Sequence, residues 1–391
     1  MRIVLATRAL AWPGGSETYL LTVAEALQRL GHGATIHCHE EGEAAELARE
    51  RGTPVETSLD AVDACDAALA QDAPAAYELA ERFANVPILF VAHSRVEVQV
   101  PPQLAGVCPA AVAMNDRIAE HLRALAVAPE VVRLRQPVDR RRFRALGISS
   151  LRAPRVVAFG NNLPRTRERM LAAACGRLGY EFGVLGDRGG AGGSLHPEVE
   201  LADAQIALAI GRCAVEAMAC AKAVYVYGLG GGDGWVTPST YPALEADGFT
   251  GRGTDSALDV DVLTEELAWF GPTMGRDNLD LAAAHHDALD HARELIEVWR
   301  RLGAPSPQPS EAAELARMGR LQRQTEETSA TFEMAAQSRG MALERAEADR
   351  DTARAELAAL KGSLRYRIGA ALAWPLDAIR RIRARRRSRG R

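Results

Sequence analysis

The chain of 391 residues has no long apolar run and no closely paired cysteines. Because a membrane-spanning helix needs about 20 consecutive apolar residues, we expect no such helix. The six cysteines stand far apart without a CxxC motif, and most lie in apolar stretches. We therefore expect reduced core cysteines and a cytoplasmic protein. The chain begins with an arginine after the first methionine and then a strand, which predicts no signal peptide.

Two nucleotide-binding fingerprints are also missing. The loop after the first expected strand lacks GxGxxG, which argues against a dinucleotide site. The glycine-rich loop at residues 188–194 lacks the Gly-Lys-Ser/Thr ending of a P-loop, so we assign it no phosphate chemistry. The formal net charge of −4 does not favour a nucleic-acid partner, and we expect none.

The composition is that of a globular protein, with 47% hydrophobic and 25% charged residues, and the length allows two domains. An apolar strand at Arg2–Ala6, an amphipathic helix at Tyr19–Leu30 and a strand at Ala34–Cys38 follow one another. This βαβ pattern predicts a parallel sheet.

Two glycines mark the loop between the first strand and the first helix. Gly14 and Gly15 let the backbone approach a ligand closely, and Ser16 is a candidate helix cap. The open alternative is a plain glycine turn without a ligand.

The stretch at residues 202–227 carries the strongest local pattern. It predicts a strand at Gln205–Ile210, a turn at Gly211 and a short alanine-rich helix at Arg212–Ala221. The first N–H groups of such a helix point to the carboxyl edge of the sheet, where a phosphate can bind. Glu216, about one turn into the helix, is placed to accept hydrogen bonds from two ribose hydroxyls. The alternative is an ordinary buried helix with one exposed acid.

The order of these motifs resembles that of the family 4 (group 1) glycosyltransferases. The resemblance rests on Glu216-Ala-Met-Ala-Cys, on the first glycine loop, on Asp-Gly-x-Thr-Gly at residues 247–251, and on Pro137, Asp139 and Phe143. It covers about residues 1–300. It implies the GT-B fold, an α/β architecture of two Rossmann-like domains that face a cleft, here followed by a long C-terminal helical extension.

The resemblance and the composition together predict the order of domains. We expect an N-terminal Rossmann-like acceptor domain at residues 1–146, a C-terminal Rossmann-like donor domain at 147–302, a linker at 303–309, a helical, weakly coiled-coil segment at 310–362 and a basic amphipathic tail at 363–391. The donor domain is expected to end in a helix at Leu279–Leu302 that returns to the first domain.

The resemblance also implies the roles of site residues. His93 follows the strand Pro87–Ala92 and would reach the donor sugar, because ligands bind at the carboxyl ends of parallel strands. Arg165 and Arg167 would clamp the diphosphate, since guanidinium pairs well with phosphate oxygens. The implied donor-binding residues are Gly14, Gly15, Gly211, Arg212, Glu216, Asp233 and Trp235. A capped strand end and a solvated helix start are the respective alternatives for the histidine and the arginines.

The chain departs from the family pattern at Leu208, where a second glutamate usually stands eight positions before the first. Asp233 and Trp235 lie in a glycine-rich stretch at residues 228–235, which is expected to be a loop at the edge of the site. Asp233 would bind sugar hydroxyls and Trp235 would stack on a sugar or a base. The open alternative is that both only close the loop.

Histidine pairs suggest a metal site, but we do not predict one. His37 and His39 share a strand face by alternation, yet no third ligand is evident nearby in the sequence. His286 and His291 are not four residues apart on their helix. We therefore expect no metal ion.

The end of the chain has its own charge pattern. From Gly362 onward there are ten arginines and one aspartate, interleaved with Leu, Ile and Trp. Such a segment suits an anionic membrane, at about 1 kcal/mol per basic residue near the headgroups. We expect peripheral attachment to the inner face of the cell membrane through 363–391, with nucleic acid as the open alternative. A 3-4 spacing of apolar residues in 310–362 allows oligomer formation through a coiled coil.

The leading hypothesis is a glycosyltransferase that moves a hexose from a donor such as UDP- or GDP-hexose to a glycan or lipid-linked acceptor. It would serve cell-surface polysaccharide or glycoconjugate synthesis, with retention as the resemblance implies and without a cofactor. The alternatives are a non-catalytic GT-B scaffold that recruits partners to the membrane, which Leu208 favours, and a sugar-nucleotide 2-epimerase. The leading hypothesis needs Glu216 to face the gap between the domains, and a sealed carboxylate would contradict it.

Overall fold

The computed structural model describes two α/β halves and a few helical residues C-terminal to them. The described residues are 1–95, 99–102, 107–125, 130–145, 153–160, 165–186, 194–228, 231–252, 259–302, 315, 318–325, 328–329, 350, 352 and 354. They fall into two compact units, Met1–Arg323 and Gln324–Arg391. The described residues of the second unit are helical.

Several expectations lie outside the described residues. The linker at 303–309, most of the segment at 310–362 and the tail at 363–391 are among them, so the coiled coil and the membrane attachment stay predictions. No helix in the described ranges is long and apolar enough to cross a membrane. All six cysteines are free, as expected.

Seven parallel strands form the first sheet, in the order β5-β3-β1-β6-β7-β8-β9. Their bounds are Arg2–Ala6 (β1), Gly33–His37 (β3), Val55–Glu56 (β5), Ala67–Ala70 (β6), Ile88–Ala92 (β7), Ala110–Ala113 (β8) and Glu130–Arg133 (β9). Two short strands, Ala9–Leu10 (β2) and Glu40–Glu41 (β4), pair with each other. The parallel pairing confirms the sheet type that the βαβ pattern predicts.

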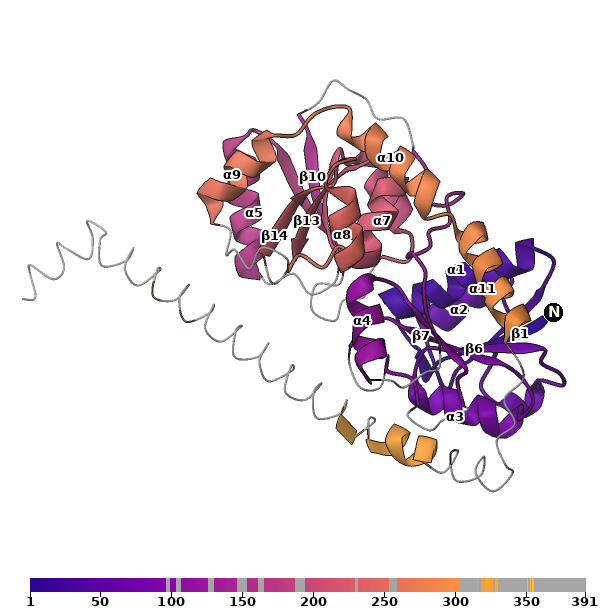
Figure 1. The fold of residues 1–391 in the computed structure, drawn as a ribbon. Coiled ribbons are helices and arrows are strands. Elements are labelled where there is room, and N and C mark those ends of the chain that lie inside the picture. The colour runs from indigo at the N-terminus through magenta and orange to yellow at the C-terminus, as the bar shows by residue number, and fades with distance from the viewer. Residues whose placement is uncertain are drawn as a thin grey trace, which may run out of the picture. The chain divides into compact units, whose positions relative to one another are not determined.

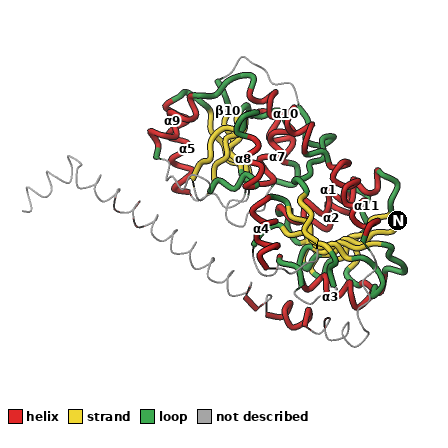
Figure 2. Tube along the Cα trace, viewed as in Figure 1, coloured by secondary structure: helices red, strands yellow, loops and turns green. Residues whose placement is uncertain are grey.

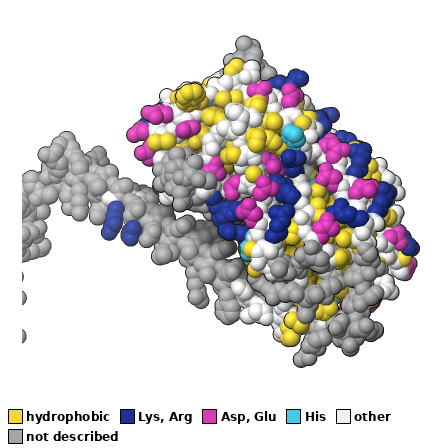
Figure 3. Space-filling view, in the orientation of Figure 1, with side chains coloured by type: hydrophobic (Ala, Val, Ile, Leu, Met, Phe, Trp, Pro, Cys, Tyr) yellow, Lys and Arg dark blue, Asp and Glu magenta, His cyan; other side chains and the backbone are white. Residues whose placement is uncertain are grey.

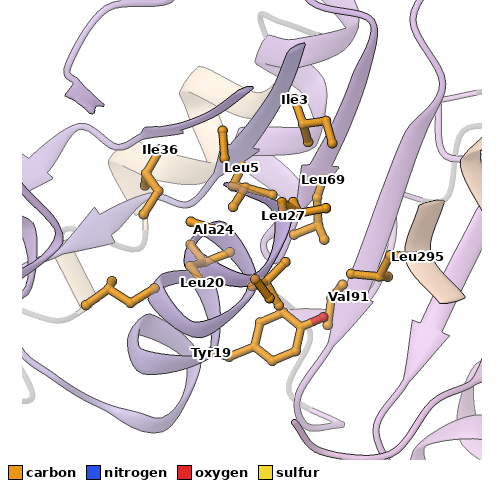
Figure 4. Packing of buried hydrophobic residues seen from close by; sticks show 14 of the residues in the cluster. Ile3, Leu5, Tyr19, Leu20, Ala24, Leu27, Ile36, Leu69, Val91 and Leu295 are labelled. Atoms are coloured by element: carbon orange, nitrogen blue, oxygen red, sulfur yellow. The ribbon is translucent and has the colours of Figure 1, made fainter. Parts of the chain in front are cut away.

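Helices cover both faces of this sheet, because its strands are apolar on both sides. The helices are Gly15–Arg29 (α1), Glu43–Glu50 (α2), Ala73–Arg82 (α3), Asp116–Leu125 (α4) and Ala288–Arg301 (α11). Ile3 and Leu5 of β1 pack with α1, α2 and α11, and Figure 4 shows both in the buried cluster that also holds Leu295 of α11. Val4 and Ala6 pack on the opposite face with α3 and α4.

The second sheet has five strands in the order β11-β10-β12-β13-β14. Its elements are Arg155–Phe159 (β10), Arg165–Arg177 (α5), Glu181–Leu185 (β11), Pro197–Glu200 (α6), Ile206–Ala209 (β12), Gly211–Ala219 (α7), Ala223–Gly228 (β13), Gly231–Trp235 (β14), Tyr241–Asp247 (α8), Val260–Ala268 (α9) and Met274–His285 (α10). Helices α5 and α9 pack on one face, and α7, α8 and α10 pack on the other (Figures 1 and 2). The expectation of a loop at residues 228–235 was wrong for Gly231–Trp235, because that segment pairs antiparallel with β13 as β14.

The chain crosses between the halves twice, and the two crossings are bonded to each other. The first crossing comes after β9 and contains Val138, and the second joins α10 to α11. The Val138 N–H donates to the His286 carbonyl (2.8 Å), and the Ala288 N–H donates to the Val138 carbonyl (3.2 Å). The His286 ring places Nδ1 2.7 Å from the Gln136 carbonyl oxygen. These bonds fix the two crossings at one point.

The returning helix is broken, contrary to the single helix expected at Leu279–Leu302. Asp287 is extended (ψ 128°), and its carboxylate accepts a hydrogen bond from the Leu289 N–H (2.8 Å), which starts α11 afresh. Helix α11 packs on the first half as expected. Its Trp299 is 2% exposed, and the indole Nε1 donates to the Ala68 carbonyl (3.0 Å).

We predict that Trp299→Ala lowers the free energy of unfolding by about 3–5 kcal/mol, because it removes a buried ring from a packed core. Urea unfolding followed by circular dichroism measures the change. The control is Trp269→Ala, whose side chain is 76% exposed and whose loss should stay within about 0.5 kcal/mol. Equal losses in the two variants would show that α11 is not part of the core.

Candidate functional site

The second sheet has a topological switch point between β10 and β12. Strand β10 is followed by β11 on one side, and the chain then returns to place β12 on the other side. In open parallel sheets, ligands bind outside the carboxyl ends of the strands at such a point. Phe159 at the end of β10 pairs with Ala209 at the end of β12. Gly160 and the turn at Gly211 therefore flank the switch point.

Two glycines stand at these strand ends. Gly160 (φ 147°) and Gly211 (φ 53°) both adopt positive φ, which favours glycine. Among described atoms, a Cβ on Gly211 would meet nothing within 4 Å, and one on Gly160 would meet only Cys213 Sγ at 3.9 Å. Helix α7 starts here, and its N-cap Ile210 supplies no side-chain hydrogen bond within the described structure. The Gly211 N–H donates to the Phe249 carbonyl (2.9 Å), and the N–H groups that follow it, with the helix dipole, favour an anion at this position.

One of the two predicted diphosphate arginines lies near this edge. Arg167, in the first turn of α5, donates to the Tyr227 hydroxyl (3.3 Å), and its guanidinium is 5.8 Å from the centre of the Tyr227 ring. Tyr227 stands near the end of β13, the strand next to β12. Arg165 begins α5, but its side chain lies outside the described residues.

Glu216, the predicted ribose ligand, is buried and paired with Arg212. The Arg212 Nε donates to Glu216 Oε1 (2.8 Å), and each side chain is 7% exposed. The same guanidinium donates to Thr22 Oγ1 of α1 (2.6 Å) and to the Pro137 carbonyl (3.2 Å). Arg212 therefore joins α7 to the first half and to the first crossing. Burial raises the pKa of the Glu216 carboxyl, and the Arg212 charge opposes that shift.

The requirement that Glu216 face an open gap is not met, so the donor site predicted at this carboxylate is contradicted in the described arrangement. Its carboxylate is engaged by Arg212, a residue expected to bind the donor from the start of the helix. Leu208 does not offer a substitute, because it lies inside β12 with 2% exposure. The alternative, an ordinary buried helix with one exposed acid, is not met either, because this acid lies in a buried ion pair.

The first sheet has a polar network at its own switch point, between β1 and β6. The Gln71 amide donates to Thr7 Oγ1 (3.1 Å), and Gln71 Oε1 lies 3.1 Å from His93 Nε2. Because that oxygen only accepts, the His93 Nε2–H is the donor, and Nδ1 keeps its lone pair. Burial and then the Arg212 charge lower the pKa of His93 to about 3, so the ring is neutral near pH 7. The Tyr19 ring packs edge-on to His93 at 4.8 Å.

The Glu17 carboxylate lies against the first glycine loop, at Gly14. Gly14 is the N-cap of α1 and Gly15 is its first residue. Ser16 lies inside the helix and donates to Glu17 Oε2 (3.0 Å), so the expected serine cap was wrong. A Cβ on Gly14 would stand 2.4 Å from Glu17 Oε2, so a side chain there would require the Glu17 carboxylate to move.

Trp235 is a core residue and does not stack on a ligand. It is 8% exposed, its Nε1 donates to the Glu266 carbonyl (2.8 Å), and its ring packs edge-on to Tyr225 at 5.3 Å. The expectation failed because the glycine-rich stretch forms β14, which turns this ring into the sheet's apolar face. Asp233 is half-buried on the same strand.

The two strand-end histidines have a third potential ligand beside them, which the sequence did not predict. Nitrogen atoms of His37 and His39 and an oxygen of Glu78 lie within 4.8 Å of one another. The expectation that no third ligand is nearby was therefore wrong. Helix α3 brings Glu78 to the end of β3, and no short-range spacing in the sequence signals this.

A cavity of about 270 Å³ lies beside the chain crossings. It is lined by Asp116, Arg133, Arg135, Glu245, His285, His286, Asp287, Asp290, His291 and Glu294. Arg133 donates to Glu245 of α8 (2.5 Å) and to Asp116 (2.8 Å), so acids and bases here pair across the two halves. Figure 3 shows acidic and basic side chains interspersed on the face in view. We assign no ligand to this cavity because its charges already bind one another.

Comparisons with known proteins find similarity at the level of structure. No protein-family model matches the chain, and no curated protein matches it. The chain is similar to HepE of Anabaena in complex with UDP-glucose, with 15% identity, coverage of 77% of this chain and 100% of HepE, and a TM-score of 0.54. HepE with UDP and glucose gives the same identity and coverage and a TM-score of 0.53. MurG of Acinetobacter baumannii gives 12% identity, 77% and 100% coverage and a TM-score of 0.49. The HepE similarity confirms the GT-B fold.

We predict that Arg212→Met and Glu216→Leu each lower the free energy of unfolding by about 3–5 kcal/mol, because each leaves a buried charge without its partner. The double variant should lose less than the sum, since no buried charge remains in it. Urea unfolding of all four proteins gives the interaction energy. Strictly additive losses would show that the two side chains do not act as a pair.

Proposed function

We propose that the protein is a glycosyltransferase that moves a hexose from a nucleotide diphosphate sugar to a glycan or lipid-linked acceptor. The supporting observation is that α7 begins at Gly211, beside the switch point of the second sheet and next to the strand end at Gly160, where the positive end of the helix would stabilise a diphosphate. HepE, which shares the fold, was solved with UDP-glucose. We extend that donor class to this chain, in cell-surface polysaccharide or glycoconjugate synthesis.

The chemistry needs a group that stabilises the departing diphosphate. Negative charge develops on the departing diphosphate in the transition state. The positive end of α7 and the Arg167 guanidinium would stabilise that charge. We propose that His93, neutral near pH 7, orients the sugar through Nδ1, since its Nε2–H is held by Gln71. Transfer would retain the anomeric configuration, and this scheme uses no cofactor.

Glu216 enters this scheme only if Arg212 releases it. The Arg212 guanidinium holds Glu216 and also binds Thr22 and Pro137 of the other half. A ribose that binds the Glu216 carboxylate must therefore replace Arg212 Nε as its hydrogen-bond partner. We propose that closure of the two halves through Arg212 and binding of the ribose compete for one carboxylate.

A second candidate is a non-catalytic GT-B scaffold. It is favoured by the buried Arg212–Glu216 pair and by Leu208 inside β12, which together leave the family's two acidic positions without an exposed carboxylate. A scaffold of this kind need not bind a nucleotide sugar. Calorimetric titration of the purified chain with UDP- and GDP-sugars separates the two candidates, because heat of saturable binding supports the transferase and its absence supports the scaffold.

We predict that Gly211→Asp weakens UDP binding about tenfold or more relative to Gly211→Asn, because only the aspartate adds negative charge at the start of α7. Asn and Asp are similar in size, and both tolerate positive φ better than other residues with a side chain. The Asn variant is therefore the matched control for shape and backbone strain. Isothermal titration with UDP measures both. Equal affinities would remove the helix start from the binding site.

We predict that Arg167→Ala weakens UDP binding about tenfold, the size of one lost charge-assisted hydrogen bond. The control is Arg169→Ala on the same helix, because the Arg169 side chain is exposed. This variant removes the same charge from α5 and leaves the contact between Arg167 and Tyr227 intact. If the two variants lose affinity equally, the effect is one of general charge, and Arg167 has no specific contact with the diphosphate.

A further inference from the structure

A cluster of two imidazoles and one carboxylate lies at the end of β3, apart from the proposed donor site. His37 is the last residue of β3, His39 comes two positions later, and Glu78 comes from α3. Glu78 Oε2 is 2.5 Å from His39 Nε2 and 3.7 Å from His37 Nε2. The two rings pack edge-on with centres 5.0 Å apart. Three ligand-type atoms from two elements thus converge on one point.

The His37 ring is prepared as a ligand. Its Nδ1 lies 3.0 Å from the Glu56 carbonyl oxygen, which only accepts, so Nδ1 carries the proton and Nε2 carries a lone pair. The side chain is 1% exposed, and among described residues Nε2 has no hydrogen-bond partner. A buried acceptor without a partner costs free energy and needs an explanation. An imidazole held through one nitrogen by a carbonyl, with the other nitrogen bare, is the usual arrangement of a metal-binding histidine.

The Nε2 atom of His39 has two neighbours, and it cannot form a hydrogen bond with both. That nitrogen is 2.5 Å from Glu78 Oε2, which needs a donor, and 2.6 Å from Arg323 Nη1, which needs an acceptor. One ring nitrogen cannot donate and accept at once. Arg323 also pairs with Glu78 Oε1. The guanidinium therefore brings positive charge to a cluster whose ligand atoms all offer lone pairs.

We propose that His37, His39 and Glu78 form a binding site for one divalent transition-metal ion, with Zn²⁺ as the preferred ion. A metal ion accepts a lone pair from each of the three atoms, which gives His37 Nε2 a partner and removes the conflict at His39. Two histidines and one glutamate form a known three-ligand set for zinc that leaves a fourth position for water. Imidazole ligands favour transition metals over Ca²⁺ and Mg²⁺, which prefer oxygen.

The geometry requires a small contraction. Zinc bonds of about 2.0–2.2 Å place neighbouring ligand atoms about 3.3 Å apart, whereas these atoms lie within 4.8 Å of one another. The side chain of His39 is 34% exposed and Glu78 is 12% exposed, so the histidine has room to rotate while His37 stays fixed.

Metal binding and the Arg323 contact exclude each other, because both use the lone pair of His39 Nε2. Arg323 lies in a helical stretch at residues 318–325, C-terminal to the two α/β halves. The same stretch contacts α3 elsewhere, since Arg320 lies 3.5 Å from Glu81. Zinc binding would thus remove the contact of this stretch with His39.

The test uses the full chain, stripped of metal with EDTA and titrated with ZnCl₂ by calorimetry, with metal content measured by mass spectrometry after dialysis. We expect one zinc ion per chain. His39→Ala and Glu78→Gln should each weaken binding by about tenfold to a hundredfold. Arg323→Ala should tighten binding about tenfold, since it removes a competing charge-assisted hydrogen bond. The control is His196→Ala, because the side chain of this histidine is 62% exposed and lies outside the cluster.

Circular dichroism and thermal unfolding of each apo protein show whether a variant is folded. If a ligand variant does not fold, Arg323→Ala still tests the site, because it keeps all three ligands. Two results would overturn the proposal. One is that neither the wild-type protein nor Arg323→Ala retains zinc. The other is that the wild-type protein, His39→Ala and Glu78→Gln bind zinc with the same affinity, which would indicate an adventitious ion only.

Discussion

The two chain crossings between the halves are fastened to each other, and the placement of every candidate site residue depends on that junction. Val138 exchanges backbone hydrogen bonds with the turn at His286 and Ala288, so the first crossing and the returning chain form a short parallel bridge. The carboxyl edges of both sheets then lie at a fixed distance from this bridge. Arg212 of α7 spans that distance and binds Thr22 and the Pro137 carbonyl.

The proposed ribose-binding role of Glu216 and its ion pair with Arg212 are incompatible. A carboxylate that binds ribose must be accessible to the ligand, whereas a carboxylate that neutralises a buried arginine is not. Breaking a buried ion pair costs more free energy than breaking an exposed one, because each separated charge stays buried without a partner. Under the proposed competition, that cost sets how tightly a ligand must bind to separate the pair.

The sequence alone predicts the features that depend on residues close together in the chain. Strand, turn and helix at residues 205–219 can be predicted from apolar periodicity, and the positions of Gly211 and His93 from the rule that ligands meet strand ends. Partners across space could not be predicted. Nothing near Arg212 in the chain indicates Thr22, and nothing near His37 and His39 indicates Glu78. The prediction for Trp235 failed for a related reason, because a glycine-rich sequence does not show that the segment pairs as an edge strand. The break before α11 depends on one aspartate cap that also suits a helix interior.

The start of α7 at Gly211 has a consequence for how such a protein evolves. The Gly211 N–H donates to the Phe249 carbonyl (2.9 Å), and both Gly160 and Gly211 adopt positive φ. These features belong to the backbone, so substitutions elsewhere in α7 and β12 leave them unaltered as long as the backbone keeps its path. Selection on a site of this kind acts on chain geometry and on two glycines, so the surrounding sequence is free to diverge until little of its ancestry can be read from the letters alone.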